Sequence, residues 1–426
     1  MTDAAGRMLR SRRGPFLLLY GTCFSVSLLV YSRSFDNSFR ADDFTILTHV
    51  ITHGLFAAMA PTEHIAFFRP ASVALAFAEY KLFGLQSGLY LAFNYSLHLA
   101  VSLLTIKILL ELGFGRFVAT LAGTLFLLGY GHYGKPVMWA SSGGSLSAVL
   151  LSLLAILLAL RWMKREGDPK GALGGARRRG DLVLIAGMSL LAMLFYEGAL
   201  LTPILIVFVL AVHPGREAIR KPSRLLLLFM PVILWTLIAM LVSRVHPQYE
   251  NIMAATHVPI YFVKYCGFIA VPMQESATLP PAFHWLAAAF RHAHGTLLTV
   301  GVMVLVLVTT AAVKGSWKIR ILAVWLFLAI LPFTFVKLPS GFLELRYVYY
   351  AAIPFCGLAA CAFQRLVSGR SRCVEAGAIV VLVGISISTT AVVHLLEQKY
   401  DAESRSALNE TRLIDLRRLV ANGNRE

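Results

Sequence analysis

The sequence predicts an all-α, polytopic integral membrane protein of about eleven transmembrane helices, with short interfacial helices on the extracytoplasmic side. Of the 426 residues, 58% are hydrophobic and only 14% are charged, whereas soluble domains carry about 25% charged residues. Long apolar runs recur along the chain, and basic residues collect in some of the loops between them. These observations together predict a chain whose surrounding solvent is mainly lipid.

Nine segments are long and apolar enough to be clear candidates for crossing a bilayer, because a helix needs about 20 apolar residues to span a core of roughly 30 Å. They are 15–32, 88–111, 116–131, 145–162, 225–242, 296–313, 321–337, 347–363 and 374–393. The first segment follows four arginines, and no A-x-A-like cleavage site comes after it. We therefore interpret it as an uncleaved anchor rather than a signal peptide.

Three further apolar segments have unusual lengths. Residues 70–84 and 258–272 would each form a helix of about 22 Å, which is too short to span, and their lysine and glutamate residues add to the cost. Residues 182–212 would be about 46 Å long as one helix, which is too long for one crossing, and Glu197 lies at the midpoint. Length alone does not decide how these three segments are placed.

The distribution of basic residues resolves the topology, because cytoplasmic loops collect Lys and Arg. The N-terminus through Gly14 and the loops 112–116, 161–181, 213–224, 314–320 and 364–373 hold 22 of the 39 basic residues and only 5 of the 22 acidic ones. The rest of the chain is balanced, with 17 of each. All six segments share one side only if 70–84 and 258–272 do not cross and 182–212 crosses twice. This predicts eleven spans in a cell membrane, with the N-terminus cytoplasmic and the C-terminus extracytoplasmic.

The same topology divides the chain into a cytoplasmic N-terminus (1–14), a transmembrane domain (15–393) and an extracytoplasmic amphipathic tail (394–426). Two extracytoplasmic loops are long, 33–87 and 243–295, and each contains one of the short apolar stretches. We expect those stretches to lie at the membrane surface as interfacial helices. Because the net charge of +17 lies in the cytoplasmic loops, it is a topology signal and requires no nucleic-acid partner.

Two adjacent carboxylates, Asp42 and Asp43, follow the first span by about ten residues in the stretch NSFRADDFTIL. A carboxylate held near the bilayer surface can act as a general base toward a hydroxyl, which is typically worth about 10²–10⁴ in rate. Neighbouring side chains point in different directions, so we expect one base and one supporting partner. The pair also has a structural interpretation, because an aspartate before an apolar run is a common helix start.

Several short motifs occur in order along residues 15–365: FRADDF after the first span, FFRP at 67–70, KLFG at 81–84, NYSLHL at 94–99, PVMW at 136–139, YEGALLTP at 196–203 and ELRYVYYAAIPF at 344–355. In this order and topology they resemble the GT-C superfamily of glycosyltransferases, in particular the protein O-mannosyltransferase-like branch. The chain departs from that pattern in three places. Lys135 and the GGS stretch 143–145 stand where relatives often carry acids, and Tyr196–Glu197 stands where relatives often carry a lysine–glutamate pair.

The resemblance implies a membrane enzyme that moves a monosaccharide from a polyprenyl-phosphate donor to an acceptor. The catalytic base falls on Asp42, with Asp43 as the second acid. The departing phosphate needs a cationic partner, and a guanidinium matches phosphate oxygens in a bidentate fork. Arg346, followed by Tyr347, and Arg69 are the candidates at the outer ends of apolar elements. Both arginines also fit interfacial anchors whose side chains reach the membrane surface.

Two other residues are candidates for lining the cavity of such a site. Glu197 lies between two helices of only about 15 residues each, so it should face a cavity rather than lipid; a hydrogen-bonded turn or a pairing with Lys or Arg is the alternative. His98 lies four residues after Asn94 and shares its helical face. The alternative for His98 is a structural role, as a packed and hydrogen-bonded histidine in the core.

The expected partners are a polyprenyl-phosphate sugar, a protein, lipid or glycan acceptor, and the lipid bilayer. No metal site is predicted and no cofactor is required, although a role for a divalent metal stays open. Two other functions remain. A lipid-linked glycan flippase or solute transporter would have charged pairs along its path and two related halves, which we do not find in the sequence. A catalytically inactive GT-C-fold scaffold is compatible with the departures at Lys135 and 143–145.

Overall fold

The computed structural model is helical wherever its segments have regular structure. It describes residues 14–40, 42–60, 68–129, 136–166, 175–213, 221–243, 255–271, 293–335, 343, 345–368 and 407–423, together with residues 377, 380 and 384. Within these ranges no residue belongs to a β-strand. The predicted all-α fold class is confirmed.

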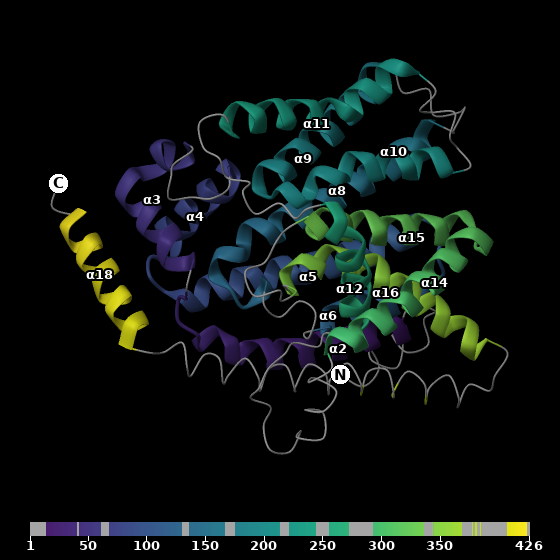
Figure 1. Cartoon of the computed structure of the whole chain (residues 1–426), viewed down its shortest axis with the longest axis horizontal. Helices are drawn as coiled ribbons and strands as arrows, with labels where there is room; N and C mark the ends of the chain where they lie inside the picture. Colours follow the sequence, from purple (N-terminus) through teal and green to yellow (C-terminus); the bar gives the residue numbers. More distant parts are fainter. Residues whose placement is uncertain are drawn as a thin grey trace.

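The order of the helices along the chain can be followed in Figure 1. The α-helices are α2 (Gly14–Ser32), α3 (Asp42–Met59), α4 (Pro70–Phe83), α5 (Ser87–Glu111), α6 (Arg116–Leu128), α8 (Gly143–Glu166), α9 (Gly175–Phe195), α10 (Thr202–Val212), α11 (Pro222–Ser243), α12 (Val258–Ala270), α14 (Ala293–Lys314), α15 (Trp317–Ile330), α16 (Leu345–Val367) and α18 (Ala407–Gly423). Short 3₁₀ turns are η1 (Arg33–Asp36), η2 (Ala140–Ser142), η3 (Glu197–Leu201), η5 (Ala255–His257) and η7 (Leu331–Phe335).

Five helical segments in the described ranges are long and apolar enough to cross a membrane: Ser87–Glu111, Ala140–Glu166, Gly295–Lys314, Trp317–Phe335 and Arg346–Val367. Each coincides with a predicted span, so the chain is a multi-pass membrane protein. The predicted spans at 116–131 and 225–242, and the two halves of 182–212, correspond to shorter apolar helices, and the first span is the 19-residue α2. The predicted span 374–393 lies almost wholly outside the described residues, so the total of eleven stays a prediction.

The segment 182–212 forms two helices, as predicted. Helix α9 ends at Phe195, and Tyr196 adopts extended backbone (φ −159°, ψ 126°) before η3 begins at Glu197. The two short apolar stretches also have the expected length: α4 has 14 residues and α12 has 13. A helix of that length covers about 20 Å, which is less than the apolar core of a bilayer.

Four of the loops predicted to be cytoplasmic are joined by direct contacts at one end of the molecule. Lys164 Nζ lies 2.6 Å from Glu111 Oε2, and Arg224 Nη2 lies 3.2 Å from Glu166 Oε1. The loop at 112–116 is tied to the loop at 314–320, because Lys318 Nζ donates to the Gly113 carbonyl. The ring centroids of His213 and Trp317 lie 4.6 Å apart. These loops therefore share one side, and the cytoplasmic assignment of that side remains a prediction.

Helix α8 is at the centre of the bundle and packs against α4, α5, α9 and α10. Its side chains Leu153, Ile156, Leu160 and Trp162 are buried in the main apolar cluster of the fold. Because α8 contributes almost no lipid-facing surface in its middle, its first residues are held rigidly. Those residues, 143–145, directly follow η2 and border the candidate site described below.

The pair α12 and α14 shows how tightly helices pack at the edge of the bundle. A Cβ at Gly301 would lie 2.0 Å from the Val263 carbonyl oxygen, and one at Gly267 would lie 2.1 Å from the Leu297 carbonyl oxygen. Small residues at such points let two helix backbones approach closely in a membrane. On α14, Val302 and Leu307 are more than half exposed, so they face lipid.

Helices α3, α4 and α18 form an assembly beside the main bundle (Figure 1), called the outer assembly below. Helix α3 is kinked at Gly54, whose φ of 68° is in the region that favours glycine. Leu416 of α18 is buried in a cluster with Phe39, Phe44 and Leu47. The predicted C-terminal amphipathic helix therefore exists, and its apolar side packs on α3.

Candidate functional site

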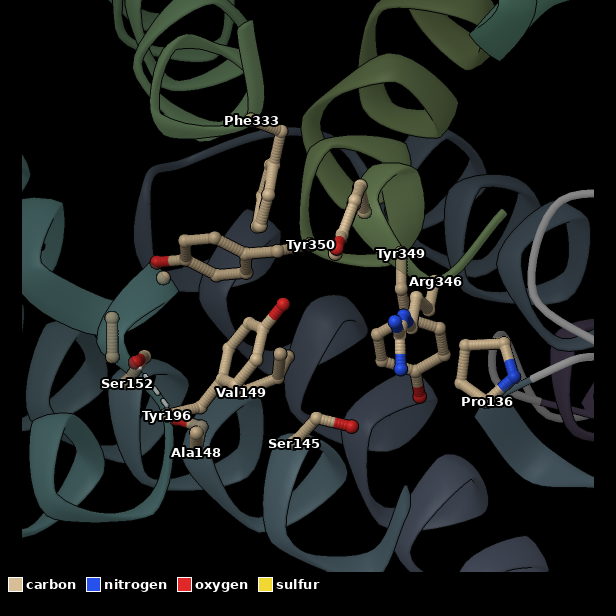
Figure 2. Close-up of a pocket in the computed structure, with 13 residues that line it drawn as sticks. Pro136, Ser145, Ala148, Val149, Ser152, Tyr196, Phe333, Arg346, Tyr349 and Tyr350 are labelled. Carbon is tan, nitrogen blue, oxygen red and sulfur yellow. Dashed lines mark hydrogen bonds between the residues drawn. The ribbon is translucent and has the colours of Figure 1, made fainter. Parts of the chain in front are cut away.

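The larger cavity in the described part of the chain has a volume of about 410 Å³ and lies between α8, η3, η7 and α16. Figure 2 shows Tyr196, Phe333 and Arg346 arranged around it. Aromatic side chains make up much of its wall: Tyr196, Phe333, Tyr347, Tyr349 and Tyr350. Its lining, largely apolar and aromatic with a few polar groups, is typical of small-molecule sites.

Three of the aromatic rings form a continuous stack along the cavity. The rings of Phe333 and Tyr347 are nearly parallel, 9° apart in orientation, with centroids separated by 4.6 Å. Tyr196 continues the stack, with its centroid 6.3 Å from that of Phe333. The stack joins η7, α16 and the residue before η3, and it gives the cavity a flat, rigid face. Tyr347, predicted from the sequence to help bind phosphate, is part of this face.

Arg346 brings a positive charge to the same cavity. Its side chain is half-buried and lines the wall, and its guanidinium carbon lies 5.1 Å from the centroid of the Trp139 ring and 5.3 Å from that of Tyr347. Contacts with two aromatic faces hold a guanidinium in place without neutralising its charge. The structure therefore brings Arg346 and Tyr347, both predicted site residues, together at one cavity.

Arg69 and Glu197, two other predicted site residues, bind each other. Arg69 Nε donates to Glu197 Oε2 at 2.7 Å, and Arg69 Nη2 donates to Glu197 Oε1. The guanidinium carbon of Arg69 also lies 4.4 Å from the centroid of the Tyr196 ring. The ion pair ties the start of α4 to η3, which agrees with the pairing considered for Glu197 from the sequence. It also compensates much of the charge of Arg69.

Asp42 and Asp43 have opposite surroundings. Asp42 is exposed at the first turn of α3, whereas Asp43 is buried. The two carboxylate oxygens of Asp43 accept backbone N–H groups, from Arg40 at 3.0 Å and from Ser141 at 2.7 Å. Burial raises the pKa of Asp43 to about 6, against the lowering effect of these hydrogen bonds. The arrangement suits the division into one free base and one supporting acid.

Asp43 borders a second, smaller cavity of about 220 Å³, together with Glu79 of α4. Glu79 is buried, and its Oε1 atom has no hydrogen-bond partner among the residues that the structure describes. Burial, followed by the nearby charge of Asp43, raises the pKa of Glu79 to about 8. In the sequence, Glu79 was considered only as a residue that makes a membrane crossing by 70–84 more costly. An acidic residue within an apolar helix often has a functional role, so this pattern could have identified Glu79 as a candidate site residue.

One short segment, 136–142, borders both cavities. Pro136 lines the larger cavity, while Ala140 and Ser141 line the smaller one. Between them, the Trp139 carbonyl accepts a hydrogen bond from Asn94 Nδ2 at 2.8 Å, and the Trp139 ring contacts Arg346. The segment, called the dividing segment below, therefore lies between the cavity lined by Arg346 and the cavity lined by Asp43 and Glu79.

His98 lies behind the larger cavity and lines neither cavity. It is fully buried, with Nδ1 2.9 Å from the Tyr349 hydroxyl and Nε2 3.2 Å from the Leu127 carbonyl oxygen. Both ring nitrogens are thus used to join α5 to α6 and α16. His98 reaches the cavity only through Tyr349, which does line it.

The described residues contain no cluster of three or more His, Cys, Asp or Glu side chains that could hold a metal ion. Asp43 and Glu79 bring two carboxyls to the smaller cavity.

No protein-family model and no curated protein sequence matches the chain. Solved structures do match. The archaeal oligosaccharyltransferase AglB from Archaeoglobus fulgidus, in complex with an inhibitory peptide and a dolichol-phosphate, is similar with a TM-score of 0.52 at 13% identity. That match covers 92% of this chain and 56% of the archaeal chain. ArnT from Cupriavidus metallidurans bound to undecaprenyl phosphate is similar with a TM-score of 0.48 at 15% identity, over 90% of this chain and 75% of ArnT.

A second structure of the archaeal enzyme, in the apo form, gives the same TM-score of 0.52 over 89% of this chain and 56% of the archaeal chain. The chain therefore has the fold of the GT-C glycosyltransferases, as the motif order in the sequence led us to expect. At this level of sequence identity the likeness concerns the fold, and the chemistry has to be argued from the site.

Proposed function

We propose that this protein is a membrane glycosyltransferase that moves a monosaccharide from a polyprenyl-phosphate donor to a hydroxyl-bearing acceptor at the extracytoplasmic face. One observation carries the proposal: the dividing segment 136–142 has a cavity with Arg346 and stacked aromatic rings beside it, and the Asp42–Asp43 pair attached to it through Ser141. Sugar transfer from a phosphate needs a cationic phosphate site and a carboxylate base, and the dividing segment contacts both Arg346 and the carboxylate pair.

In the proposed reaction, the acceptor oxygen attacks the anomeric carbon of the donor and loses its proton to Asp42. The bond between that carbon and the phosphate oxygen breaks, and its electron pair leaves with the phosphate. A single displacement of this kind inverts the anomeric configuration. Asp43 is held by backbone N–H groups, so it fixes the start of α3 and thereby orients Asp42.

Arg346 is the main phosphate ligand in this proposal, and Tyr347 forms the adjoining wall. Negative charge grows on the leaving phosphate as its bond to carbon breaks, and a preorganised cation stabilises that charge without moving. Arg69 has the same role from the start of α4, where Glu197 orients it through two hydrogen bonds. The flat faces of Phe333 and Tyr196 suit the apolar side of a sugar ring.

The lipid carrier follows from the same considerations. The archaeal oligosaccharyltransferase of similar fold was solved with a dolichol-phosphate. In this chain the candidate site lies at the end of the bundle opposite the basic loops, which we predict to be extracytoplasmic. Nucleotide sugars are absent from that side of the membrane, whereas a lipid-linked sugar keeps its tail in the bilayer and presents its phosphate at the surface.

The proposal predicts that Asp42→Asn abolishes transfer while the protein stays folded and inserted. Removing a general base typically costs about 10²–10⁴ in rate. The measurement is release of sugar from short-chain polyprenyl-phosphate hexoses and pentoses in proteoliposomes. Asp36→Asn is the matched control, because Asp36 is an exposed acid of the same outer segment, and it should retain wild-type activity.

Full activity in Asp42→Asn would overturn the assignment of the base. A wild-type protein that neither binds nor turns over the donor would instead support a catalytically inactive scaffold. Uptake of a lipid-linked sugar into liposomes that survives removal of both aspartates would support a transporter.

A further inference from the structure

The smaller cavity has an apolar wall and a polar group that the proposed mechanism does not use. Phe39, Leu47 and Tyr90 supply much of the wall, while Asp43 and Glu79 bring carboxyl groups to it. The Tyr90 hydroxyl donates to the Gly84 carbonyl oxygen at 2.8 Å. Its hydrogen bond is therefore already made inside the protein.

The other polar groups of this cavity are also satisfied, apart from Glu79. Asp43 accepts hydrogen bonds from the backbone of Arg40 and from Ser141, which lines the same cavity. Glu79 is only 5% exposed, and Oε1 has no partner within the described ranges. A buried polar atom without a partner costs about 1–3 kcal/mol. Glu79 lines the cavity, so a molecule bound there can supply the missing partner.

A glycine makes room for this carboxyl. A Cβ at Gly143 would lie 2.8 Å from Glu79 Oε1 and 3.2 Å from Asn94 Oδ1. Asn94 Oδ1 is another buried oxygen that has no partner in the part of the chain that the structure describes. Both oxygens therefore lie close to Gly143, and any side chain at residue 143 would crowd them.

We propose that the smaller cavity is the acceptor site of the transferase and binds a single hydroxyl carried on a small, mostly apolar group, with Glu79 as the hydrogen-bonding residue. This inference rests on the proposed function. Glu79 is a binding residue, and Asp42 remains the base that takes the acceptor's proton.

The lining decides between classes of acceptor. A polyol such as a sugar would bury several hydroxyls against Phe39, Leu47 and Tyr90, and each hydroxyl without a partner would cost free energy. An alcohol with an apolar body needs only one polar contact. Because burial raises the pKa of Glu79 to about 8, the group is protonated at neutral pH and exchanges hydrogen bonds with a neutral hydroxyl.

The position of the cavity fits this use. It borders the dividing segment on the carboxyl side, while the larger cavity with Arg346 borders the same segment. An acceptor held there approaches from the Asp42–Asp43 side, and the phosphate leaves toward Arg346. A single displacement requires such an arrangement, because the attacking and leaving oxygens lie on opposite sides of the anomeric carbon.

The test uses simple alcohols as acceptors in competition with water. Purified protein in proteoliposomes receives short-chain polyprenyl-phosphate hexoses and pentoses, with either 1-butanol or glycerol at equal hydroxyl concentration. The ratio of alkyl glycoside to free sugar is measured. We expect 1-butanol to give a higher ratio than glycerol in the wild type. In Glu79→Leu the butanol ratio should fall about 10-fold, as expected for one lost hydrogen bond, while consumption of donor by water stays within about 2-fold.

A relocation variant separates a lost hydrogen bond from lost packing. Residue 143 has helical backbone (φ −50°, ψ −39°), so it accepts a side chain once Glu79 is shortened. Glu79→Ala should lose the butanol preference, and Glu79→Ala combined with Gly143→Asp should regain most of it. Glu111→Gln is the control for a distant acid, because Glu111 pairs with Lys164 at the opposite end of the molecule.

Each outcome decides the question. A wild-type protein that consumes no donor overturns the proposed function and this inference together. Normal donor consumption with an unchanged butanol ratio in Glu79→Leu overturns only the acceptor site, as does a glycerol ratio equal to that of butanol. If Glu79→Leu does not fold, Ala76→Met takes its place. Ala76 lines the same cavity, so the larger side chain should lower the butanol ratio, and an unchanged ratio would overturn the inference.

Discussion

At the scale of single residues, the site depends on three carboxyl groups with different surroundings. Asp42 is exposed, Asp43 is fixed by two backbone N–H groups, and Glu79 is buried with one unsatisfied oxygen within the described residues. The unsatisfied group is stable only while it keeps its proton, because a second negative charge beside Asp43 would be costly. Protonation of Glu79 should therefore be visible in the stability of the whole protein.

The pH dependence of unfolding tests this. The pKa of Glu79 is raised from an ordinary value of 4.5 to about 8, so between these values the folded protein keeps a proton that the unfolded chain has lost. Stability should then fall as pH rises through this window and level off above it. Asp43 adds a fall in the same direction between 3.8 and about 6.

In Glu79→Gln the fall between pH 6 and 8 should be smaller, and at pH 8 the variant should unfold a few degrees above the wild type. Thermal unfolding in detergent at several pH values measures it. Glu410→Gln, at an exposed position on α18, serves as the control and should follow the wild-type curve. Parallel curves for the wild type and Glu79→Gln would contradict the protonated state of Glu79.

At the scale of helices, close approach decides which pairs pack well. The α12–α14 pair depends on Gly267 and Gly301, where backbone atoms occupy the space of a side chain. In lipid there is little hydrophobic drive between helices, so van der Waals contact provides much of the association. Helix α12 packs against η7, which carries Phe333 of the aromatic stack. The position of α12 there depends on its contact with α14.

Gly301→Ala should therefore destabilise the protein by about 1–3 kcal/mol, the usual cost of overpacking. The added methyl would lie 2.0 Å from the Val263 carbonyl oxygen, so the helices must separate. Gly295→Ala is the matched control on the same helix, because nothing lies within 4 Å of its Cβ position, and it should be neutral. Thermal unfolding in detergent distinguishes them, and equal stability of both variants would show that α12 and α14 are not so closely packed.

The helices could largely be predicted from the sequence, whereas the site could be predicted only in part. The length of an apolar run largely determines where a membrane-spanning helix begins and ends, so the expected span 88–111 and the observed helix Ser87–Glu111 nearly coincide. Contacts across long separations are not encoded locally. Arg69 and Glu197 are 128 residues apart, and both were predicted at the site without their pairing. Glu79 was not predicted because its role depends on Gly143 and Asp43, and these residues come close to Glu79 only in the folded chain.

At the scale of the whole molecule, charge separates the two ends. Ion pairs among Glu111, Lys164, Glu166 and Arg224 lie at one end, and the Asp42–Asp43 pair lies in the outer assembly. The positive-inside rule assigns the basic end to the cytoplasm. The proposed donor requires the opposite end to be extracytoplasmic.

Cysteine labelling tests this orientation in a variant whose five native cysteines are replaced. Asp36→Cys should react with a membrane-impermeant maleimide added to intact cells, because Asp36 is exposed near the site. Lys164→Cys, also exposed, should react only after the membrane is permeabilised. The reverse pattern would contradict both the topology and a lipid-linked donor on the outer face.

The packing of α18 has a consequence for how the protein matures. Leu416 is buried against Phe39 and Phe44, which flank Arg40 and Asp42–Asp43. Synthesis reaches α18 only after the helices from α2 to α16 have been made, so this hydrophobic cluster can close only late. Until then, the spans insert while the assembly of α3, α4 and α18 is still incomplete beside the two aspartates.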